Sequence, residues 1–250
     1  MASDIYVKRL DIVDSTNNYV REEAAVLWNE ARGCNAVAVT ANHQTNGRGQ
    51  RGNVWISQQG ENLLMTVLVR PGGSLEVSKQ FLLSQTVAVV LHTAMKCYGI
   101  DTKLKWPNDI YVGDRKLAGV LIELDCCGAF VEQAIIGVGL NINQCEFPPM
   151  DRVPVSMKML LGREVKVDEV LDTVLDCFSH CYGEMILNPE YVVAEYNSLL
   201  LGLGEERLFS DAEGEFTAVI EGVEPMGALI LRRTDGTLSR YAFKEVEQFV

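Results

Sequence analysis

The chain lacks any stretch of apolar residues long enough to cross a membrane. A membrane-spanning helix needs about 20 consecutive apolar residues, and the longest apolar runs, such as residues 86–91, are far shorter. The first residues alternate charged and apolar side chains and do not form the apolar core of a signal peptide. We therefore expect a cytoplasmic protein with no membrane partner.

Basic residues are scarce relative to acidic ones. The sequence has 22 Lys and Arg against 34 Asp and Glu, which gives a net charge of -12. Such a charge repels the phosphate backbone of nucleic acids unless the basic residues are segregated on one face. Nothing before Ile5, where the first predicted strand begins, could form a DNA-binding helix-turn-helix. We therefore expect no nucleic-acid partner.

The chain also lacks cysteines in the paired spacing of disulfide-rich or zinc-binding proteins. Its seven cysteines stand at positions 34, 97, 126, 127, 145, 177 and 181, without a CxxC motif. Cys177, His180 and Cys181 share one face of a predicted helix, but a zinc site needs two further ligands at suitable spacing. Buried free thiols are the simpler interpretation. The sequence predicts neither a disulfide framework nor a metal site built from protein ligands.

Apolar residues make up 48% of the 250 positions, enough to build a large core. Their spacing predicts strands at residues 5–13, 35–41, 63–70, 103–106, 110–112, 117–124 and 130–143. It predicts helices from the cap Asp14-Ser15-Thr16 to Arg32, over residues 77–98, and within 155–201, with breaks at Gly162 and Asn188-Pro189. Because strands lead into helices and hairpins lie among them, the predicted fold class is α/β (α+β) with a mixed sheet.

The pattern changes after residue 203. From Gly204 onward, short alternating strands are separated by turns at residues 211–214, 225–227 and 235–236. This pattern predicts a small C-terminal β-barrel of about 45 residues. We therefore expect two domains, a larger one at residues 1–203 and a smaller one at residues 204–250.

A glycine-rich segment, Gly47-Arg48-Gly49-Gln50-Arg51-Gly52, matches the GxGxxG pattern of dinucleotide-binding and kinase loops. The match fails on context, because no helix is predicted after it and the kinase motifs VAIK, HRD and DFG are absent. Residues 43–55 nevertheless contain no acid, although the protein is strongly acidic. Glycines let backbone N–H groups approach an anion, and arginines add charge-assisted hydrogen bonds. The segment indicates an anion-binding loop; a flexible surface loop is the alternative.

Three further segments place polar residues at predicted strand ends, where function often lies. Lys105-Trp106-Pro107-Asn108-Asp109 combines a cation, an aromatic ring and two hydrogen-bonding side chains in one turn. Lys116 precedes the small residues Ala118 and Gly119, and residues 137–143 join glycines to amides at the end of an apolar strand. An ordinary turn, a solvated lysine and a bulged strand are the simpler interpretations of these segments.

Taken in order, the motifs of this chain resemble those of the biotin protein ligases. They are Asp14-Ser15-Thr16-Asn17, Gly47-Arg48-Gly49 with Arg51-Gly52 and Trp55, Lys105 to Asp109, Lys116 to Gly119, and Gly139 to Asn141. The resemblance extends into residues 216–231 and so covers nearly the whole chain. It implies a catalytic domain related to class II aminoacyl-tRNA synthetases and lipoate ligases, followed by a small SH3-like β-barrel. It also implies the monofunctional form, without an N-terminal DNA-binding domain.

The resemblance implies roles for individual residues. Those expected to hydrogen-bond the ureido ring of biotin are Ser15, Thr16, Asn17 and Gln44, and those expected in the loop that closes over biotin and its adenylate are Gly47, Arg48, Gly49, Gln50 and Arg51. Trp55 would stack near the adenine and Asn141 would belong to the nucleotide pocket, while Gly119 would allow close approach of a ligand. Lys116 would meet the biotin carboxylate and the phosphate, and Asp109 would present or deprotonate the acceptor lysine.

The implied activity has two steps. Biotin and ATP give biotinyl-5′-AMP and pyrophosphate, and biotin then passes to a lysine of a biotin carboxyl carrier protein domain. Arg48 and Lys116 are the candidates that offset the repulsion between the biotin carboxylate and the α-phosphate, and Mg²⁺ would neutralise the departing pyrophosphate. Well-known members carry arginine where this chain has Gln50, a position that helps to retain the adenylate; Arg51 is the candidate to compensate. Monomer and homodimer both remain open.

Three other functions fit parts of the sequence. A lipoate ligase shares the fold and the adenylate chemistry, but the GRGxRGxxW loop favours biotin, because a ureido ring needs matched polar partners. A biotin-sensing repressor would need a recognition helix and a basic face. Ala94-Met95-Lys96 repeats the acceptor tripeptide of biotin carriers, but it falls inside a predicted helix, where Lys96 is more simply a solvated cation at the helix end.

Overall fold

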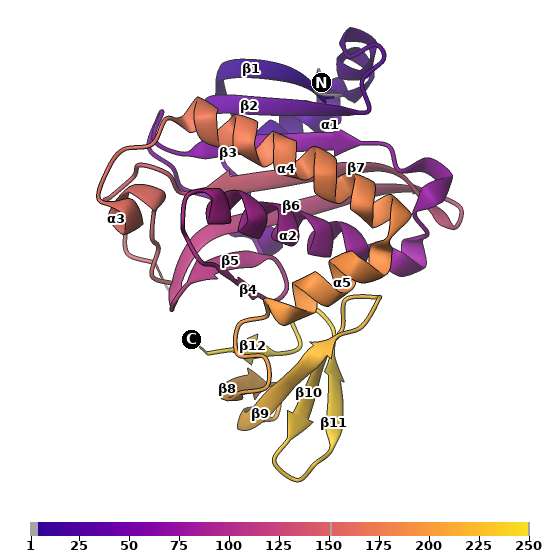
Figure 1. Cartoon of the computed structure of the whole chain (residues 1–250), viewed down its shortest axis with the longest axis vertical. Coiled ribbons are helices and arrows are strands. Elements are labelled where there is room, and N and C mark those ends of the chain that lie inside the picture. The colour runs from indigo at the N-terminus through magenta and orange to yellow at the C-terminus, as the bar shows by residue number, and fades with distance from the viewer. Residues whose placement is uncertain (1–4, 151, 250) are drawn as a thin grey trace.

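The computed structural model describes residues 5–150 and 152–249, except for the side chain of Arg51. Its larger sheet has seven strands in the order β1-β2-β3-β7-β6-β5-β4. The strands are β1 (Ile5–Val13), β2 (Ala36–Gln44), β3 (Leu63–Val69), β4 (Lys103–Lys105), β5 (Asp109–Val112), β6 (Arg115–Cys127) and β7 (Phe130–Leu140). β1 runs parallel to β2 and the other neighbours are antiparallel, so the predicted mixed sheet is confirmed (Figure 1).

Successive side chains of a strand point to opposite faces, and the apolar residues of this sheet divide accordingly. Val37 and Val39 of β2, Leu68 of β3 and Ile135 of β7 pack against helix α1 (Thr16–Glu30). Their neighbours in the strands, at positions 36, 38, 67, 69, 134 and 136, belong to a larger core on the opposite face. The sheet is therefore buried on both faces.

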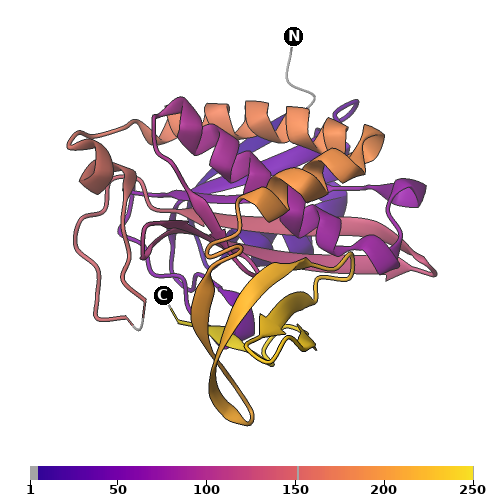
Figure 2. The ribbon, with the colours of Figure 1, turned by 60° about the horizontal axis from the view of Figure 1, so that its bottom comes forward.

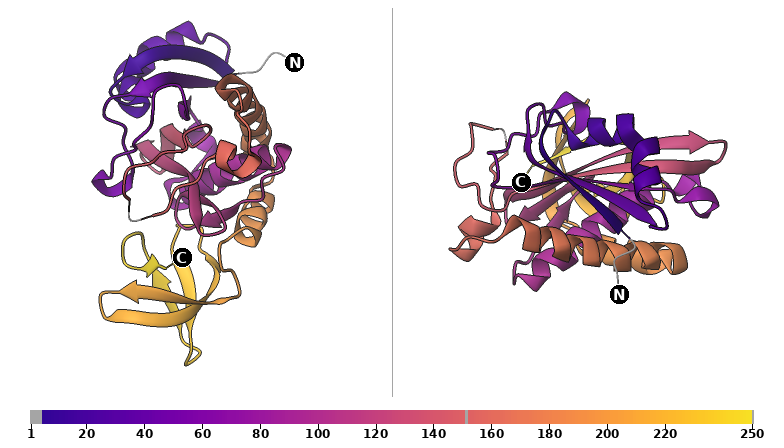
Figure 3. Two further views of the ribbon diagram at one scale, coloured as in Figure 1. Left: turned by 90° about the vertical axis from the view of Figure 1, so that its left-hand side faces the viewer. Right: turned by 90° about the horizontal axis from the view of Figure 1, so that it is seen from above.

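Three helices cover the face opposite α1: α2 (Phe81–Cys97), α4 (Val167–Leu187) and α5 (Pro189–Ser198). Figure 3 shows α1 and α4 on opposite sides of the sheet when the molecule is seen from above. The central position predicted for α2 is confirmed, because most of its side chains are buried. The short α3 (Met157–Leu161) ends at Gly162, which adopts φ +68°, and α5 begins at Pro189, so both predicted breaks are present.

Two details of the predicted helices are wrong. Ser15 stands at the N-cap of α1, but its side chain makes no capping hydrogen bond. It is buried and faces the cavity described below, away from the helix end. The helix predicted from residue 77 begins at Phe81, because residues 77–79 form a separate 3₁₀ turn, η3 (Val77–Lys79).

The C-terminal residues form a second, antiparallel sheet of five strands in the order β11-β10-β9-β8-β12. The strands are β8 (Glu206–Asp211), β9 (Gly214–Val223), β10 (Leu229–Arg233), β11 (Leu238–Tyr241) and β12 (Glu247–Gln248). The three predicted turns fall between successive strands, as expected. Within residues 206–249 no ladder joins β11 to β12, so closure into a barrel stays a prediction.

The second sheet packs against the end of the first one that carries the turn between β4 and β5. Trp106 Nε1 donates to the Gly227 carbonyl at 3.0 Å. The ring of Phe243 lies 5.3 Å from that of Trp106 and 5.7 Å from that of Phe81, measured between centroids. Figure 2 shows the C-terminal strands directly below the large sheet and α5. The contact therefore holds the C-terminal sheet beside the 105–109 turn.

Among the described helices, none combines the length and the apolar character that a membrane span requires.

All seven cysteines are free. Burial raises the pKa of the Cys177 thiol to about 11 and also raises the pKa of Cys181, so both thiols stay protonated at neutral pH. Protonated thiols are poor metal ligands, which agrees with the interpretation of these residues as part of the helix packing.

Candidate active site

A cavity of about 730 Å³ lies where the start of α1, the glycine-rich loop and the β4–β5 turn meet. Residues in 147–150 and 152–154, and residues 246–249, also line it. The residues predicted for the site that line it are Ser15, Thr16, Asn17, Gln44, Arg48, Gly49, Gln50, Trp55, Asp109, Lys116, Gly119 and Asn141. Gly47 is not among the lining residues, and its carbonyl accepts a hydrogen bond from Trp55 N that closes the loop. The side chain of Arg51 lies outside the described part of the chain. The volume suits a ligand of the size of a nucleotide.

One end of the cavity is built from the buried polar side chains of Thr16, Asn17 and Thr66 and the partly buried side chain of Gln44. Thr16 donates through its backbone N and its Oγ1 to Gln44 Oε1, at 2.7 and 3.0 Å. The hydroxyl of Thr66 on β3 is 2.8 Å from Thr16 Oγ1 and 2.7 Å from Asn17 Oδ1. Because buried polar groups are costly when unpaired, this network fixes the orientation of all four side chains. The network can therefore offer hydrogen-bond donors and acceptors in fixed positions to a small polar ring of a ligand.

Gly137 of β7 gives Asn17 the space that it occupies. A Cβ at position 137 would lie 2.9 Å from Asn17 Cγ and 3.0 Å from Asn17 Nδ2, closer than real Cβ contacts. Any larger residue at position 137 would therefore displace the amide. The glycine at this strand position serves the polar network.

Arg48 is held at the edge of the cavity by Glu123 of β6. Its Nη2 lies 3.0 Å from Glu123 Oε1, and its Nη1 donates to Asn18 Oδ1 at 2.8 Å. Arg21 lies 2.9 Å from the same Glu123 oxygen, and Asn17 Nδ2 donates to the other oxygen at 3.1 Å. One carboxylate therefore joins the glycine-rich loop to α1 and β6.

The environment of Glu123 keeps this carboxylate charged. Burial disfavours its ionised form, but hydrogen bonds from Asn17 and Arg21, together with the charges of Arg21 and Arg48, outweigh burial. The pKa of Glu123 therefore lies below its ordinary value. At neutral pH the tie between the loop and the sheet is intact.

Trp55 covers a pair of facing glycines in the sheet. Gly139 of β7 is the register partner of Gly119 of β6. A Cβ on Gly139 would lie 2.7 Å from two ring atoms of Trp55, and a Cβ on Gly119 would lie 3.2 Å from a third. Lys116 Nζ lies 5.8 Å from the Trp55 ring centroid. Since Trp55 Nε1 is buried without a hydrogen-bond partner among the described residues, a bound ligand is the natural source of an acceptor for it.

The glycine-rich loop folds as a closed turn. Trp55 N donates to the Gly47 carbonyl at 2.9 Å and Gly49 N donates to the Asn53 carbonyl at 2.7 Å. Between them lies a single 3₁₀ turn, η1 (Gln50–Gly52). The GxGxxG segment therefore does not open an α-helix, and the rejection of a dinucleotide fingerprint is confirmed.

Asp109 carries both of its carboxylate oxygens in ion pairs. Lys116 Nζ lies 2.7 Å from Oδ1, and Arg152 Nη1 donates to Oδ2 at 2.7 Å. Arg152 Nη2 also lies 3.9 Å from Glu247 of β12. Burial lowers the pKa of nearby Lys105 to about 8, and the charge of Arg152 acts in the same direction. The larger sheet, Arg152 and the C-terminal sheet thus meet around one buried carboxylate.

Asn141 is oriented by the backbone around it. Its Nδ2 donates to the Val155 carbonyl at 3.1 Å, and its backbone N donates to the Leu117 carbonyl at 3.0 Å. It lines the cavity, but its amide nitrogen is already committed to the protein. Its oxygen is the atom left to face a ligand.

Three site residues were missed by sequence reasoning: Thr66, Glu123 and Arg152. The acid at position 123 follows the apolar run 120–122 in a strand, which is a detectable signal of a functional carboxylate. Thr66 is indistinguishable in sequence from an ordinary strand threonine. Arg152 reaches Asp109 from a segment 43 residues away along the chain, and no local pattern predicts that pairing.

The model of the biotin/lipoate A/B protein ligase family matches residues 10–141. The bifunctional ligase/repressor BirA of Bacillus subtilis is 31% identical over 208 residues, which are 82% of this chain and 64% of that protein. The biotin--[acetyl-CoA-carboxylase] ligase of Paracoccus denitrificans is 31% identical over 209 residues, which are 79% of this chain and 85% of that protein. This chain thus spans slightly less than two thirds of the Bacillus relative.

Solved structures agree with this similarity. The biotin protein ligase of Aquifex aeolicus, in complex with biotin and ATP, aligns with a TM-score of 0.79 at 28% identity, covering 97% of this chain and 98% of that one. The biotin protein ligase of Leishmania major aligns with a TM-score of 0.65 at 24% identity, covering 95% and 98%, a similarity of fold.

Proposed function

This chain belongs to the biotin/lipoate A/B protein ligase family, and on that premise we propose that it is a biotin protein ligase. It activates biotin with ATP to biotinyl-5′-AMP and pyrophosphate, and it then transfers biotin to a lysine of a carrier protein. The Paracoccus relative is named for acetyl-CoA carboxylase. The proposed partner here is likewise the biotin carrier domain of a biotin-dependent carboxylase.

A single observation carries the proposal: one cavity places a buried polar end, two cations and an unsatisfied indole N–H next to one another. Thr16, Asn17 and Gln44 at the polar end suit a ureido ring, which has both donors and acceptors. Arg48 and Lys116 suit the carboxylate and phosphate that must meet beyond it. Trp55 over the glycines of β6 and β7 suits the adenine.

In the first step two anions must approach each other. An oxygen of the biotin carboxylate attacks the α-phosphorus of ATP, and pyrophosphate leaves. Arg48 and Lys116 offset the repulsion, and because Glu123 and Asp109 hold them in place beforehand, little reorganisation is needed. Loss of one such contact typically costs about 3 kcal/mol, roughly a hundredfold in rate.

The product of this step is a mixed anhydride that water would hydrolyse. Exclusion of water by the glycine-rich loop is therefore part of the proposed mechanism. Gln50 lines the cavity but carries no charge. We expect it to retain the adenylate less tightly than an arginine at this position would.

In the second step the acceptor lysine, as a free amine, attacks the acyl carbon of biotinyl-AMP, and AMP leaves. The lysine ammonium must first lose a proton, and Asp109 is the proposed group that orients it or accepts that proton. The 4% exposure of Asp109 makes it a strong local acceptor for an ammonium group, since few water molecules compete.

The donor set does not fit a Mg²⁺ site made by the protein. The carboxylates that line the cavity are Asp109, Asp114 and Glu247. Asp109 is paired with Lys116 and Arg152, and Glu247 lies 3.9 Å from Arg152. Among the described residues no group of three or more His, Cys, Asp or Glu side chains converges on one point. Any Mg²⁺ that accompanies ATP would be bound mainly by phosphate oxygens and water.

Finer predictions remain part of the proposal. The C-terminal sheet is proposed to be an SH3-like barrel, with the domain boundary between residues 203 and 204. A cytoplasmic location also stays a prediction from the sequence, and monomer and homodimer both remain open.

Biotin-dependent exchange of labelled pyrophosphate into ATP tests the first half-reaction. The proposal predicts exchange with biotin and none with lipoate. Exchange with lipoate but not with biotin would favour a lipoate ligase, the rival with the same fold. Calorimetric binding of each acid to the protein gives an independent comparison.

A further inference from the structure

The guanidinium of Arg152 occupies the side of Asp109 that faces outward. Arg152 is 45% exposed at its side chain, whereas Asp109 is 4% exposed. Lys116 approaches the same carboxylate from within the cavity, next to Trp55. Arg152 therefore lies between Asp109 and solvent.

We propose that Arg152 is a displaceable gate on Asp109, and that the ammonium of the acceptor lysine replaces its guanidinium there before transfer. The inference rests on the proposed ligase function. A guanidinium and an ammonium carry the same charge and both donate to carboxylates. The exchange therefore leaves the charge balance of the cluster unchanged, and the lysine gains a partner for orientation and proton loss.

Of the two cations paired with Asp109, Arg152 is the one that moves away, and Lys116 stays in place. The backbone directly after Arg152 is held beside β6, since Lys116 N donates to the Val153 carbonyl at 2.8 Å and Val155 N donates to the Lys116 carbonyl at 2.9 Å. Only its exposed side chain must move. Lys116, at 21% exposure, is packed inside the cavity where the first half-reaction needs it.

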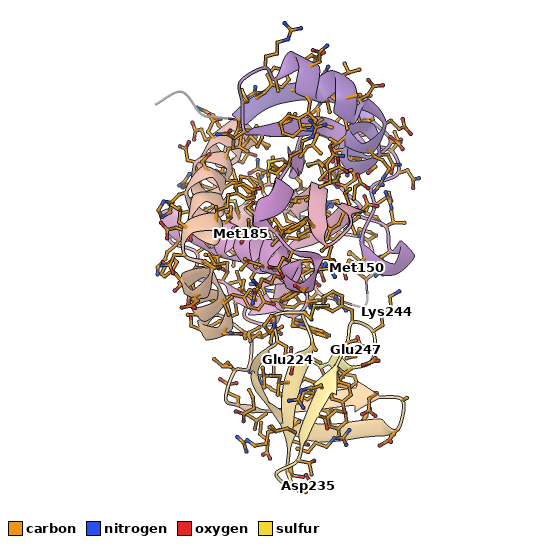
Figure 4. The ribbon with its side chains drawn as sticks, turned by 90° about the vertical axis from the view of Figure 1, so that its right-hand side faces the viewer. Met150, Met185, Glu224, Asp235, Lys244 and Glu247 are labelled. Atoms are coloured by element: carbon orange, nitrogen blue, oxygen red, sulfur yellow. The ribbon has the colours of Figure 1, made fainter. Side chains whose placement is uncertain are left out.

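Glu247 offers the displaced guanidinium a second partner. It lies 3.9 Å from Arg152 Nη2, and its side chain is 65% exposed. Figure 4 labels Met150 beside the larger sheet and Glu247 beside the C-terminal strands. Because Arg152 already lies this close to Glu247, the guanidinium can leave Asp109 and keep an acidic partner, which makes the C-terminal sheet part of the gate.

Binding of a carrier domain tests the gate directly. The probes are an apo biotin carrier domain of a carboxylase and its variant with the acceptor lysine replaced by methionine. Calorimetry measures the affinity of each for the wild-type chain, for Arg152→Ala and for Arg163→Ala. Arg163 is an exposed arginine that donates to the Glu164 carbonyl and serves as the matched control.

Arg152→Ala should bind the lysine-bearing carrier about two- to fivefold more tightly than wild type, the value expected when a half-exposed ion pair need not be broken. Its affinity for the methionine carrier should be unchanged, and Arg163→Ala should match wild type with both. Adenylate formation by Arg163→Ala, measured as pyrophosphate release, should equal that of wild type.

The proposed gate is overturned if Arg152→Ala changes the affinity for both carriers equally or binds the lysine-bearing carrier more weakly than wild type does. It is also overturned if Arg152→Ala has a raised KM for ATP. The last outcome would make Arg152 a phosphate ligand instead. Failure of the proposed function is distinguishable, because the wild-type chain would then leave the lysine-bearing carrier unmodified in the presence of biotin and ATP.

Discussion

Glu123 lies 3.0 Å from Arg48 and thereby ties the glycine-rich loop to the central sheet. A loop of this composition would otherwise be free to sample many conformations, since glycine has the largest conformational freedom of any residue. The ion pair is reinforced by Arg21 and Asn17 on the same carboxylate. Arg48 is thus placed before any ligand arrives.

Glu123→Gln should loosen this tie. The amide keeps the shape of the side chain but loses the charge that binds Arg21, Arg48 and Asn17. We therefore expect the affinity for biotin to fall about threefold to tenfold, which corresponds to about 0.7–1.4 kcal/mol for partly buried charged hydrogen bonds. Calorimetry with biotin measures this affinity. Asp125→Asn, on the same strand and exposed, is the control and should change little. Unchanged biotin affinity in Glu123→Gln would contradict this role.

The same carboxylate predicts a pH dependence. Because the pKa of Glu123 is lowered in the folded protein, its stabilising effect is fully present above the ordinary value of 4.5 and is lost as the pH falls through the lowered value. The difference in Tm between wild type and Glu123→Gln should therefore be constant near neutral pH and shrink in acid. A difference that grows as the pH falls below 4.5 would show that the sign is wrong.

Gly137→Ala should damage the polar end of the cavity without unfolding the protein. The new methyl group would push against Asn17, whose amide also bonds Thr66 and Glu123. We expect the affinity for biotin to fall at least about tenfold, because a buried network with one misplaced member loses several bonds together. Gly183→Ala, at a helix position with open space around it, is the control and should bind normally. Normal biotin binding by Gly137→Ala would argue against the placement of the ureido ring.

Gly139→Ala should act on the nucleotide instead. The methyl group would displace the Trp55 ring from the glycine pair, so we expect the KM for ATP to rise while the affinity for biotin alone stays close to wild type. Steady-state pyrophosphate release gives the KM, and the emission of Trp55 reports the altered environment. A loss of biotin affinity with an unchanged KM for ATP would reverse the assignment of the two ends of the cavity.

Lys105→Met should stabilise the protein in a pH-dependent way. Between pH 8 and pH 10.5 the unfolded chain binds a proton at Lys105 that the folded chain does not, so wild type gains stability as the pH rises through this window. Below pH 8 the variant should exceed wild type by roughly 1–3 kcal/mol, and the gap should close toward pH 10.5. Urea unfolding at several pH values measures this. Lys103→Met, exposed on the same strand, should give no such trend.

Local patterns predicted the order of strands and helices well, because the continuous apolar runs in β2, β3 and β7 follow from burial on both faces. They missed the start of α2, where a 3₁₀ turn precedes the helix. The site residues of the glycine-rich loop and the β4–β5 turn were identified from composition and resemblance. The pairing of those residues with Glu123 and Arg152 depends on tertiary packing, and no local pattern predicts which residues pair.

Mass spectrometry of a carrier after incubation with the chain, ATP, Mg²⁺ and biotin tests substrate, reaction and acceptor together. We expect an apo carrier domain to gain the mass of one biotinyl group, the same domain with its acceptor lysine replaced to gain nothing, and lipoate not to substitute for biotin. A carrier that stays unmodified with biotin, or that gains a lipoyl group instead, would contradict the proposed function.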